Sequence, residues 1–316
     1  MRIVVLDDFD LGSQNLARLA EHGEVRVYEG VPADDDELVE RAGGAEVALC
    51  SWTRVGSAAL ERLPRLRMLS LAATGTDTVD VRAATRRGVV VCRVPAYATN
   101  AVAELTLGLM LAVARKIPAA DRSCRDGRVE DWRPFVGREL CGLTLGVVGT
   151  GAIGRRVARV GRCLGMKVLA YDVCRNDELV KELDVAYVPL NRLFAESDVV
   201  TLHAPLTAET EQMVDAPLLA LLPRHALFIN AARAGLVDQP ALYEALRSGA
   251  IAGAGIDVLD MGCASAAGML ALENVVLTPH IGFNTGEAAA NLAAICTDNA
   301  VRFLEGRPRN VAGADN

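Results

Sequence analysis

The chain has 316 residues, of which 51% are hydrophobic, and its formal net charge at pH 7 is −7. This length and composition predict about two domains, each with a sizeable core, and the acidic balance argues against a nucleic-acid-binding surface. The apolar stretches are too short to cross a bilayer, and Asp7 and Asp8 fall where a signal peptide would stay apolar. We therefore expect a soluble, cytoplasmic protein with no membrane or nucleic-acid partner.

Short apolar, β-branched runs alternate with helix-like stretches in the N-terminal third of the chain. The runs that we predict as strands are Ile3–Leu6, Val25–Tyr28, Val47–Cys50, Met68–Ala72 and Val89–Cys92. Segments with helical spacing, such as Leu16–Glu21 and Asp35–Arg41, lie between them. This alternation predicts a parallel sheet that helices cover on both faces.

A long apolar helix is predicted over Asn100–Lys116, and a polar stretch, Asp121–Arg133, follows it. A second alternating series then begins, with predicted strands at Thr144–Val148, Lys167–Tyr171, Val199–Leu202, Ala226–Ile229, Gly253–Ile256 and Val275–Leu277. The last segment, Glu287–Leu304, has an alanine-rich helical pattern. We expect this helix to return to the first α/β unit, because the second unit is complete before it begins.

The eight cysteines form no CxxC pair, and most of them lie inside apolar runs. We expect them to be small buried hydrophobic residues in a reducing compartment. The pattern supports neither a zinc site nor a disulfide framework, so no metal is predicted.

The most informative stretch is the glycine-rich loop after the predicted strand Thr144–Val148. Gly149, Gly151 and Gly154 form a GxGxxG pattern that follows a strand and opens a helix, which is the context of a dinucleotide-binding fingerprint. The first glycine permits a tight turn, the second lets the backbone approach a pyrophosphate, and the third allows close packing of helix on strand. The amides at the start of the helix would hold the diphosphate.

An acidic residue closes this predicted unit. Asp172 follows the strand Lys167–Tyr171 and lies 18 residues after Gly154, close to the spacing of about 20 that the fingerprint requires. A carboxylate there accepts hydrogen bonds from the adenosine ribose and repels a 2′-phosphate. The sequence therefore predicts NAD as cofactor, in preference to NADP.

Further motifs follow one another along the chain. They are the segments 72–80 (AATGTDTVD), 100–104 (NAVAE), 142–146 (GLTLG) leading into the glycine loop, 202–207 (LHAPLT), 230–238 (NAARAGLVD) and 278–282 (TPHIG). In this order they resemble the D-isomer-specific 2-hydroxyacid dehydrogenases, the family of phosphoglycerate, glycerate, formate and phosphite dehydrogenases. The resemblance extends over nearly the whole chain.

The resemblance implies an α/β fold with two doubly wound parallel sheets. A flavodoxin-like, discontinuous substrate domain would comprise residues 1–98 and 284–316, and a Rossmann-type cofactor domain, residues 99–283, would be inserted between its parts. The active site would lie in the cleft between the domains. The implied activity is hydride transfer between NAD and a small anionic 2-hydroxy or 2-keto acid.

The resemblance also implies roles for individual residues. Arg233 would bind the substrate's acid group and the reacting oxygen, and His280 would be the acid–base group. The residues expected at the cofactor are Gly149, Gly151, Ala152, Ile153, Gly154, Asp172, His203, Pro205, Ala231, Ala232, Arg233, Asp257, His280 and Gly282. Among these, Asp257 would hydrogen-bond the nicotinamide amide. Thr74, Gly75, Thr76 and Arg54 are expected on the substrate side.

One position departs from the family pattern. The family places a glutamate five residues after the aspartate that matches Asp257, where it pairs with the histidine and raises its pKa. This chain has Gly262 there, and the following proline is also missing; the nearest acid is Asp260. Oxidation of an aldehyde hydrate or of a small phosphonate therefore stands as an alternative to keto-acid chemistry.

Two further inferences concern the oligomeric state and an alternative class of function. The apolar helix Asn100–Lys116 and the extension after it look like the family's dimerisation elements, so we expect a homodimer. A non-catalytic, NAD-binding regulator is an alternative of a different class, because some relatives of this family are corepressors. The presence of both Arg233 and His280 argues against it.

Overall fold

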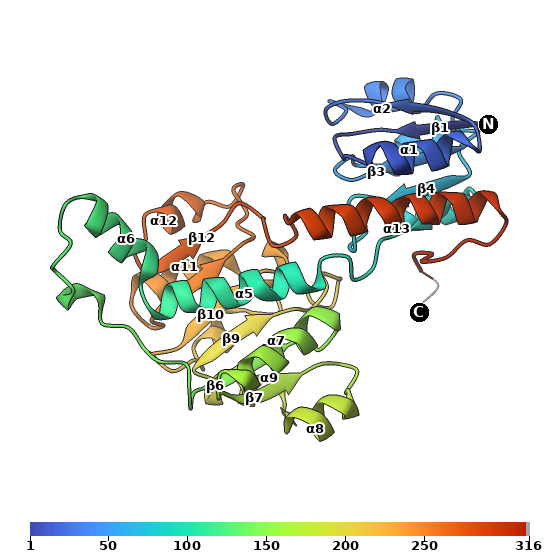
Figure 1. Ribbon diagram of the computed structural model, residues 1–316. Helices are drawn as coiled ribbons and strands as arrows, with labels where there is room; N and C mark the ends of the chain where they lie inside the picture. The colour runs from blue at the N-terminus through green and yellow to red at the C-terminus, as the bar shows by residue number, and fades with distance from the viewer. Residues whose placement is uncertain (314–316) are drawn as a thin grey trace. The chain divides into compact units, whose positions relative to one another are not determined.

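A computed structural model describes residues 1–313 of the chain (Figure 1). The chain forms two compact units. Unit 1 contains Met1–Ala98 and the residues from Asn284 onward, and unit 2 contains Thr99–Phe283. Within the described residues, no helix is both long enough and apolar enough to cross a membrane.

Unit 1 is built around a five-stranded parallel sheet. The strands lie side by side in the order β2-β1-β3-β4-β5, which is the order of flavodoxin-like doubly wound folds. The elements of the unit are β1 (Arg2–Val5), α1 (Gly12–Ala20), β2 (Glu24–Val27), α2 (Asp35–Ala42), β3 (Val47–Cys50), α3 (Ser57–Glu61), β4 (Met68–Leu71), α4 (Val81–Arg86), β5 (Val90–Cys92) and α13 (Gly286–Leu304).

Helices cover both faces of this sheet, because its central strands bury side chains on both sides. On one face Val4 and Leu69 belong to a core cluster with α2, α3 and α4. On the other face Ile3 and Met68 pack with α1 and α13. The C-terminal helix therefore returns to the first unit, as the sequence predicts.

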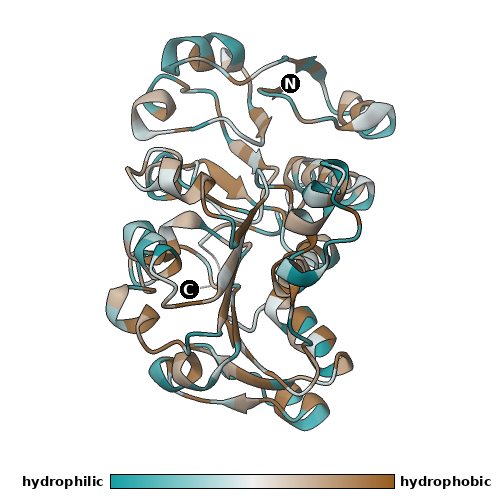
Figure 2. Ribbon diagram, turned by 90° about the vertical axis from the view of Figure 1, so that its left-hand side faces the viewer, coloured by the Kyte–Doolittle hydropathy of each residue, from teal (hydrophilic) through white to brown (hydrophobic). Residues whose placement is uncertain are grey.

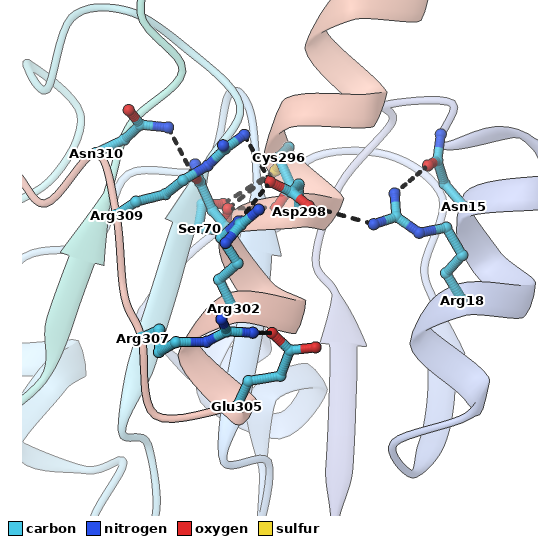
Figure 3. Close-up of polar contacts among 11 residues, drawn as sticks. Asn15, Arg18, Ser70, Cys296, Asp298, Arg302, Glu305, Arg307, Arg309 and Asn310 are labelled. Atoms are coloured by element: carbon cyan, nitrogen blue, oxygen red, sulfur yellow. Dashed lines mark hydrogen bonds and ion pairs between the residues drawn. The ribbon is translucent and has the colours of Figure 1, made fainter.

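A polar cluster ties α13 to its neighbours in unit 1 (Figure 3). The carboxylate of Asp298 on α13 accepts hydrogen bonds or ion pairs from Arg18 on α1, Arg302 on α13 and Arg309 in the C-terminal segment, at 3.3, 3.1 and 2.6 Å. Two residues before Asp298, the carbonyl of Cys296 accepts a hydrogen bond from the buried hydroxyl of Ser70 on β4 at 2.9 Å. The contacts of Arg18 and Ser70 join α13 to segments that are far from it in the sequence.

Unit 2 is built around a seven-stranded parallel sheet in the order β12-β11-β10-β9-β6-β7-β8. This is the Rossmann order with one added strand. Its elements are α5 (Thr99–Ala114), α6 (Ile117–Arg125), η1 (Arg133–Phe135), β6 (Thr144–Val148), α7 (Ala152–Cys163), β7 (Lys167–Tyr171), α8 (Asp177–Leu183), β8 (Ala186–Tyr187), α9 (Leu190–Glu196), β9 (Val199–Leu202), α10 (Ala216–Leu219), β10 (Leu227–Asn230), η2 (Ala234–Leu236), α11 (Gln239–Arg247), β11 (Gly253–Ile256), α12 (Ala266–Leu270) and β12 (Val275–Leu277).

This sheet is also doubly wound. Leu109 of α5 and Val157 of α7 pack on one face, and Phe194 of α9, Leu242 of α11 and Met269 of α12 pack on the other. Figure 2 shows the apolar strands of the sheet between two layers of helices whose outer surfaces are more hydrophilic. The α/β fold class with two parallel sheets is therefore confirmed.

Every predicted strand is present, with its ends moved by no more than one residue. Three elements differ from the sequence prediction. The strand β8 was not predicted, because two residues carry no periodicity, and the long helix ends at Ala114 because Lys116 adopts a left-handed backbone conformation with φ +53°. A separate helix, α6, then begins and occupies the first part of the predicted polar stretch.

The prediction of buried cysteines is wrong for about half of them. Cys50, Cys92 and Cys296 are buried, Cys263 is intermediate, and Cys124, Cys141, Cys163 and Cys174 are exposed. Cys124 and Cys163 lie on exposed sides of α6 and α7, and Cys141 and Cys174 lie in turns or bends. All eight are free thiols, and within the described residues no group of His, Cys, Asp or Glu side chains could hold a metal ion.

Candidate active site

The residues predicted at the cofactor follow six strands of unit 2. They are Gly149 after β6, Asp172 after β7, His203 after β9, Arg233 after β10, Asp257 after β11 and His280 after β12. Because all these strands are parallel, their carboxyl ends meet at one edge of the sheet. The strand order reverses between β6 and β9, and a doubly wound sheet binds its ligand at that point.

The glycine loop is shaped by two different requirements. Gly149 has φ +90°, and an added Cβ would lie 2.6 Å from the backbone of the 203–204 segment, while a Cβ on Gly154 would lie 1.9 Å from the carbonyl oxygen of Gly149. These two glycines are needed by the protein's own packing. A Cβ on Gly151 would meet nothing within 4 Å, so the open space there is available to a ligand at the N-terminus of α7.

A hydrogen-bonded chain fixes the carboxylate of Asp172. Asp172 accepts from the amide and the hydroxyl of Thr150 and from the amide of Cys174, at 2.5, 3.0 and 2.9 Å. The hydroxyl of Tyr187 donates to the hydroxyl of Thr150 at 2.9 Å. The guanidinium of Arg175 lies 5.7 Å from the centre of the Tyr187 ring. Thr150, Tyr187 and Arg175 were not predicted at this corner; only Thr150, between two glycines of the motif, carried a sequence signal.

The segment after β9 lines the glycine loop. The amide of His203 donates to the carbonyl of Val148 at 2.7 Å, and its Nε2 lies 3.0 Å from the hydroxyl of Thr201. Burial lowers the pKa of His203 to about 3, so the ring is neutral at physiological pH. Pro205, two residues on, is exposed. A neutral, hydrogen-bonded His203 is suited to lining the loop, and unsuited to proton transfer near pH 7.

The turn that carries Arg233 is held by the buried side chain of Asn230. The Asn230 amide donates to the carbonyl of Arg233 at 2.9 Å, and its oxygen accepts from the amide of Ala232 at 3.0 Å. The guanidinium of Arg233 itself donates to the carbonyl of Ala232 at 2.9 Å. An Asx turn of this kind fixes the backbone directly after a buried strand, and the sequence reasoning gave Asn230 no role.

Asp257 organises the turn that carries His280. Its buried carboxylate accepts from the hydroxyl of Thr278 at 2.5 Å and from the amides of Ile281 and Gly282 at 2.8 Å each. The amide of His280 donates to the carbonyl of Asp257 at 2.8 Å. His280 has φ +56°, an uncommon conformation for a non-glycine residue, and the surrounding bonds to Asp257 stabilise it. The carboxylate thus positions the histidine's turn.

The ring of His280 is influenced by two charges. Partial burial lowers the pKa of His280 below its ordinary value; the carboxylate of Asp257 opposes this shift, and the guanidinium of Arg233 adds to it. The ring also lies edge-on to Phe283, with centroids 5.7 Å apart. The two residues predicted as catalytic therefore act on one another electrostatically, and their surroundings hold the pKa of His280 below its ordinary value.

The loop that has Gly262 in place of the family's glutamate is held by a side chain of α11. The buried side chain of Gln239 accepts from the amide of Asp260 at 2.9 Å and donates to the carbonyl of Asp260 at 3.1 Å. The Asp260 carboxylate accepts from the amide of Gly262 at 2.9 Å, which closes a turn. Asp260 is therefore engaged within its own loop, and Gln239 was not predicted there.

The candidate substrate-side residues lie in unit 1, after β3 and β4. Thr74 donates its hydroxyl to the carbonyl of Val94 at 2.9 Å, which fixes the start of the 74–76 segment. Arg54 is exposed in the loop after β3. Parallel strands place both loops at the carboxyl edge of the unit 1 sheet, where doubly wound folds bind ligands.

The residues of unit 2 fit a dinucleotide cofactor. A diphosphate fits the open space at Gly151, where the amides at the N-terminus of the twelve-residue helix α7 can bind it. The acceptor oxygens of Asp172 suit the ribose. The turns of Ala231–Arg233 and His280–Gly282 lie at the same edge of the sheet.

Comparisons with known proteins agree with this arrangement. Residues 107–282 match the family model described as D-isomer specific 2-hydroxyacid dehydrogenase, NAD binding domain. A glyoxylate reductase of Korarchaeum cryptofilum is 36% identical over 313 residues, which cover 97% of this chain and 94% of the relative. A glycerate dehydrogenase of Methylorubrum extorquens is 39% identical over 290 residues, covering 88% of this chain and 89% of that one.

A solved structure extends the likeness to the whole fold. The acyclic imino acid reductase Bsp5, in complex with NADPH and D-Arg, is 32% identical to this chain and matches it with a TM-score of 0.91 over 98% of this chain and 99% of Bsp5. The sequence motifs, the two parallel sheets and these similarities agree. The chain belongs to the D-isomer specific 2-hydroxyacid dehydrogenase family.

Proposed function

We propose that this chain catalyses hydride transfer between NAD and a small 2-hydroxy or 2-keto acid, with Arg233 and His280 as its catalytic residues. The chain is an oxidoreductase of its family and uses a nicotinamide cofactor. Its similarity to a glyoxylate reductase and a glycerate dehydrogenase favours substrates of two or three carbons. The observation that carries the proposal is the placement of Arg233, Asp257 and His280 after three neighbouring strands, β10, β11 and β12.

Each of these residues has a chemical task. The bound nicotinamide supplies or accepts the hydride. The fork of donors on Arg233 binds the carboxylate and the reacting oxygen of the substrate. In reduction, His280 gives its proton to the developing alkoxide, and in oxidation its neutral ring takes that proton back. Asp257 keeps the His280 turn in place through Thr278, Ile281 and Gly282.

The substrate-side residues belong to the same proposal. The amides of Gly75 and Thr76 and the guanidinium of Arg54 are suited to an acid group, because each is a hydrogen-bond donor at a carboxyl edge. Asp172 is proposed to hold the adenosine ribose and to favour NADH over NADPH. Arg175 lies beside Tyr187 at this corner, and an arginine can bind a 2′-phosphate. The preference for NADH over NADPH therefore has to be measured.

The first test is turnover. Oxidation of NADH should be followed at 340 nm with glyoxylate, hydroxypyruvate, pyruvate and small phosphonates, for the wild type and for Arg233→Gln and His280→Gln. We expect the wild type to reduce at least one 2-keto acid. His280→Gln should lower kcat by about 10²–10⁴-fold, the usual contribution of general acid–base catalysis, and Arg233→Gln should lower kcat/KM.

Matched controls in unit 2 are Arg247→Gln and His225→Gln. Arg247 forms an exposed ion pair with Glu244 on α11, and His225 precedes β10, at the opposite edge of the sheet. Neither control should change kcat/KM more than about twofold, since an exposed ion pair contributes little. NADH binding without turnover of any acid would contradict the proposal and favour the regulator alternative.

A second candidate function is the reduction of imines formed from 2-keto acids and amines. The specific observations are the lowered pKa of His280 and the presence of Gly262 at the position where the family has a glutamate. A carbonyl needs a proton from His280 during hydride transfer, whereas an imine is basic enough to carry its own proton beforehand. Bsp5, whose fold matches this chain, is itself an imino acid reductase.

The two candidate functions differ in their dependence on His280. Turnover of glyoxylate or pyruvate should be measured with and without ammonium or methylamine, and the products separated by chromatography. If imine reduction dominates, the amine should accelerate NADH oxidation, an amino acid should form, and His280→Gln should retain that activity. If the amine has no effect, keto-acid reduction remains the function.

The partner that we propose is a second copy of the chain. The α5–α6 region and the segment after it expose several large apolar side chains: Ile117, Val129, Trp132 and Val136 are 52, 70, 72 and 72% exposed. A hollow of about 490 Å³ between α5 and α6, lined by residues such as Leu111 and Ile117, lies beside them. Exposed apolar patches of this kind are typical of interfaces.

A further inference from the structure

The loop that bears Arg54 is fixed by a buried carboxylate outside the residues discussed so far. In unit 1 the strand order reverses between β1 and β3, and flavodoxin-like sheets bind their ligands at that point. Asp7 follows β1 at this position, and the segment Ser51–Arg54 follows β3 beside it. The side chain of Asp7 is only 1% exposed.

Asp7 accepts hydrogen bonds from three successive residues of that segment. Its carboxylate accepts from the amides of Ser51, Trp52 and Thr53 at 2.9, 2.9 and 2.7 Å, and from the hydroxyl of Thr53 at 2.6 Å. Hydrogen bonds to a charged acceptor are the strong ones. A buried carboxylate with this many donors holds the loop rigidly, and removing it would leave the donors buried without an acceptor.

The side chains of the loop alternate in direction. Thr53 is buried against Asp7, while Trp52 is 47% exposed and Arg54 is exposed. The loop's amides are thus occupied by Asp7, and the groups it offers to a ligand at the carboxyl edge are the side chains of Trp52 and Arg54. A cation and an indole next to one another are suited to a small organic anion.

The same loop also ties down the second substrate-side segment. The amide of Val55 donates to the carbonyl of Thr78 at 2.8 Å, and the amide of Asp80 donates to the carbonyl of Val55 at 3.0 Å. The hydroxyl of Ser51 donates to the carbonyl of Ala72 at 3.3 Å. Asp7 therefore anchors the loop after β3, and that loop in turn anchors the segment after β4.

From these contacts we infer that Asp7 is a positioning residue for the binding of the anionic substrate, which acts by fixing Arg54 and Trp52 at the switch point of unit 1. The inference depends on the proposed function, because it concerns the acid that the enzyme binds. Asp7 does not touch the substrate, since its carboxylate is enclosed by the loop. Its loss should weaken substrate binding and leave the chemical step and the binding of NADH unchanged.

The test uses the full-length enzyme with Trp132→Phe, which leaves Trp52 as the only tryptophan. In this background, Asp7→Asn keeps the size of the side chain but turns an amide toward the loop's donors. We expect the KM for the best 2-keto acid to rise at least about tenfold, the result of leaving donors unpaired. kcat and the KM for NADH should change less than about threefold, and acrylamide should quench Trp52 more strongly.

Three further variants make the test specific. Thr53→Val removes one donor and should raise the same KM by a smaller factor, which keeps the inference testable if Asp7→Asn does not fold. In the Arg54→Gln background, Asp7→Asn should raise KM by a smaller factor than in the presence of Arg54, because part of its effect is exerted through Arg54. Ser70→Ala removes a buried hydrogen bond of unit 1 away from the loop and should leave both KM values unchanged.

Several results would overturn the inference. One is that Asp7→Asn changes neither the KM for the acid nor the quenching of Trp52. Another is that Ser70→Ala raises this KM as much as Asp7→Asn does. A third is that Asp7→Asn raises this KM by the same factor with and without Arg54→Gln. If the wild type turns over no acid, the proposed function fails. The quenching of Trp52, which needs no substrate, then still decides whether Asp7 holds the loop.

Discussion

We propose that Asp172 and its surroundings decide which dinucleotide the enzyme prefers. The carboxylate is fixed by Thr150 and Cys174, and Arg175 lies against Tyr187 beside it. Asp172→Ala should therefore narrow the preference for NADH over NADPH by about 1–3 kcal/mol, the range for lost hydrogen bonds to a charged group. The measurement is the ratio of kcat/KM for the two cofactors.

A variant of Arg175 tests the same prediction independently. The double variant Asp172→Ala, Arg175→Gln should use NADPH less well than Asp172→Ala alone, because a cation beside Tyr187 that could bind a 2′-phosphate is gone. Glu182→Ala is the matched control, since Glu182 is an exposed acid that pairs with Arg159. A wild type that prefers NADPH in initial rates would show that Asp172 does not have the proposed role.

The sequence identified the candidate residues that follow strands, but not those that hold them. Arg233 and His280 could be predicted from motifs that lie directly after apolar strands. Tyr187 is 37 residues from Thr150, and Asp7 is 46 residues from Thr53. Such pairs form only when parallel strands bring their ends to one edge. No local pattern marks them, so Gln239, Tyr187 and Asp7 were found only in the structure.

Asp298 links three elements of unit 1, and its ionisation contributes to their stability. Burial alone would raise the pKa of Asp298, but Arg302, Arg309 and Arg18 outweigh it and lower the pKa below its ordinary value. A carboxyl with a lowered pKa in the folded state stabilises above its unfolded pKa of about 3.9 and loses that contribution as the pH falls through the folded value.

Asp298→Asn should therefore destabilise unit 1 by about 1–3 kcal/mol at pH 7. The difference from the wild type should shrink as the pH falls below about 4, because the wild-type carboxyl then becomes neutral too. Urea unfolding followed by Trp52 fluorescence, with Trp132→Phe in both proteins, reports on this unit. A difference that stays constant from pH 7 to pH 3 would contradict the electrostatic explanation.

The strands were the most predictable elements. Buried parallel strands carry continuous apolar runs that are bounded by turn residues, and β3, β6, β7 and β9 begin and end where the sequence predicts. The α5–α6 junction was less predictable, because it depends on the left-handed conformation of Lys116. The prediction that the cysteines on helices are buried is wrong for a related reason, because composition does not reveal which side of a helix faces solvent.

At the scale of the whole molecule, the exposed apolar side chains of unit 2 predict self-association. Light scattering at micromolar concentration should give about twice the monomer mass of 33.5 kDa. Trp132→Asp together with Val136→Asp should shift the mass toward the monomer, because a charge in an apolar interface costs several kcal/mol. Val173→Asp, at a side chain that is 91% exposed and lies outside this segment, is the control. A wild type that stays monomeric would rule the dimer out.

The family could be predicted from the sequence because its motifs lie along nearly the whole chain in order. The substrate could not, because the proposed substrate-side loop Ser51–Arg54 takes a conformation that depends on Asp7, a residue distant in the sequence. The loop around Asp260 depends in the same way on Gln239. The departure at Gly262 is visible in the sequence, yet only the structure shows that the Asp260 carboxylate accepts from the Gly262 amide.

The measurement that tests the account most directly is kcat/KM against pH in both directions, for the wild type and for Gly262→Glu. Because the pKa of His280 lies below its ordinary value, wild-type reduction should already be falling as the pH rises toward neutrality, while oxidation stays active at neutral pH and above. Gly262→Glu should extend reduction to higher pH, because a glutamate at the family's position raises the pKa of the histidine. Wild-type reduction that persists undiminished beyond pH of about 8 would contradict the account and make Asp260 the first group to test as a partner of His280.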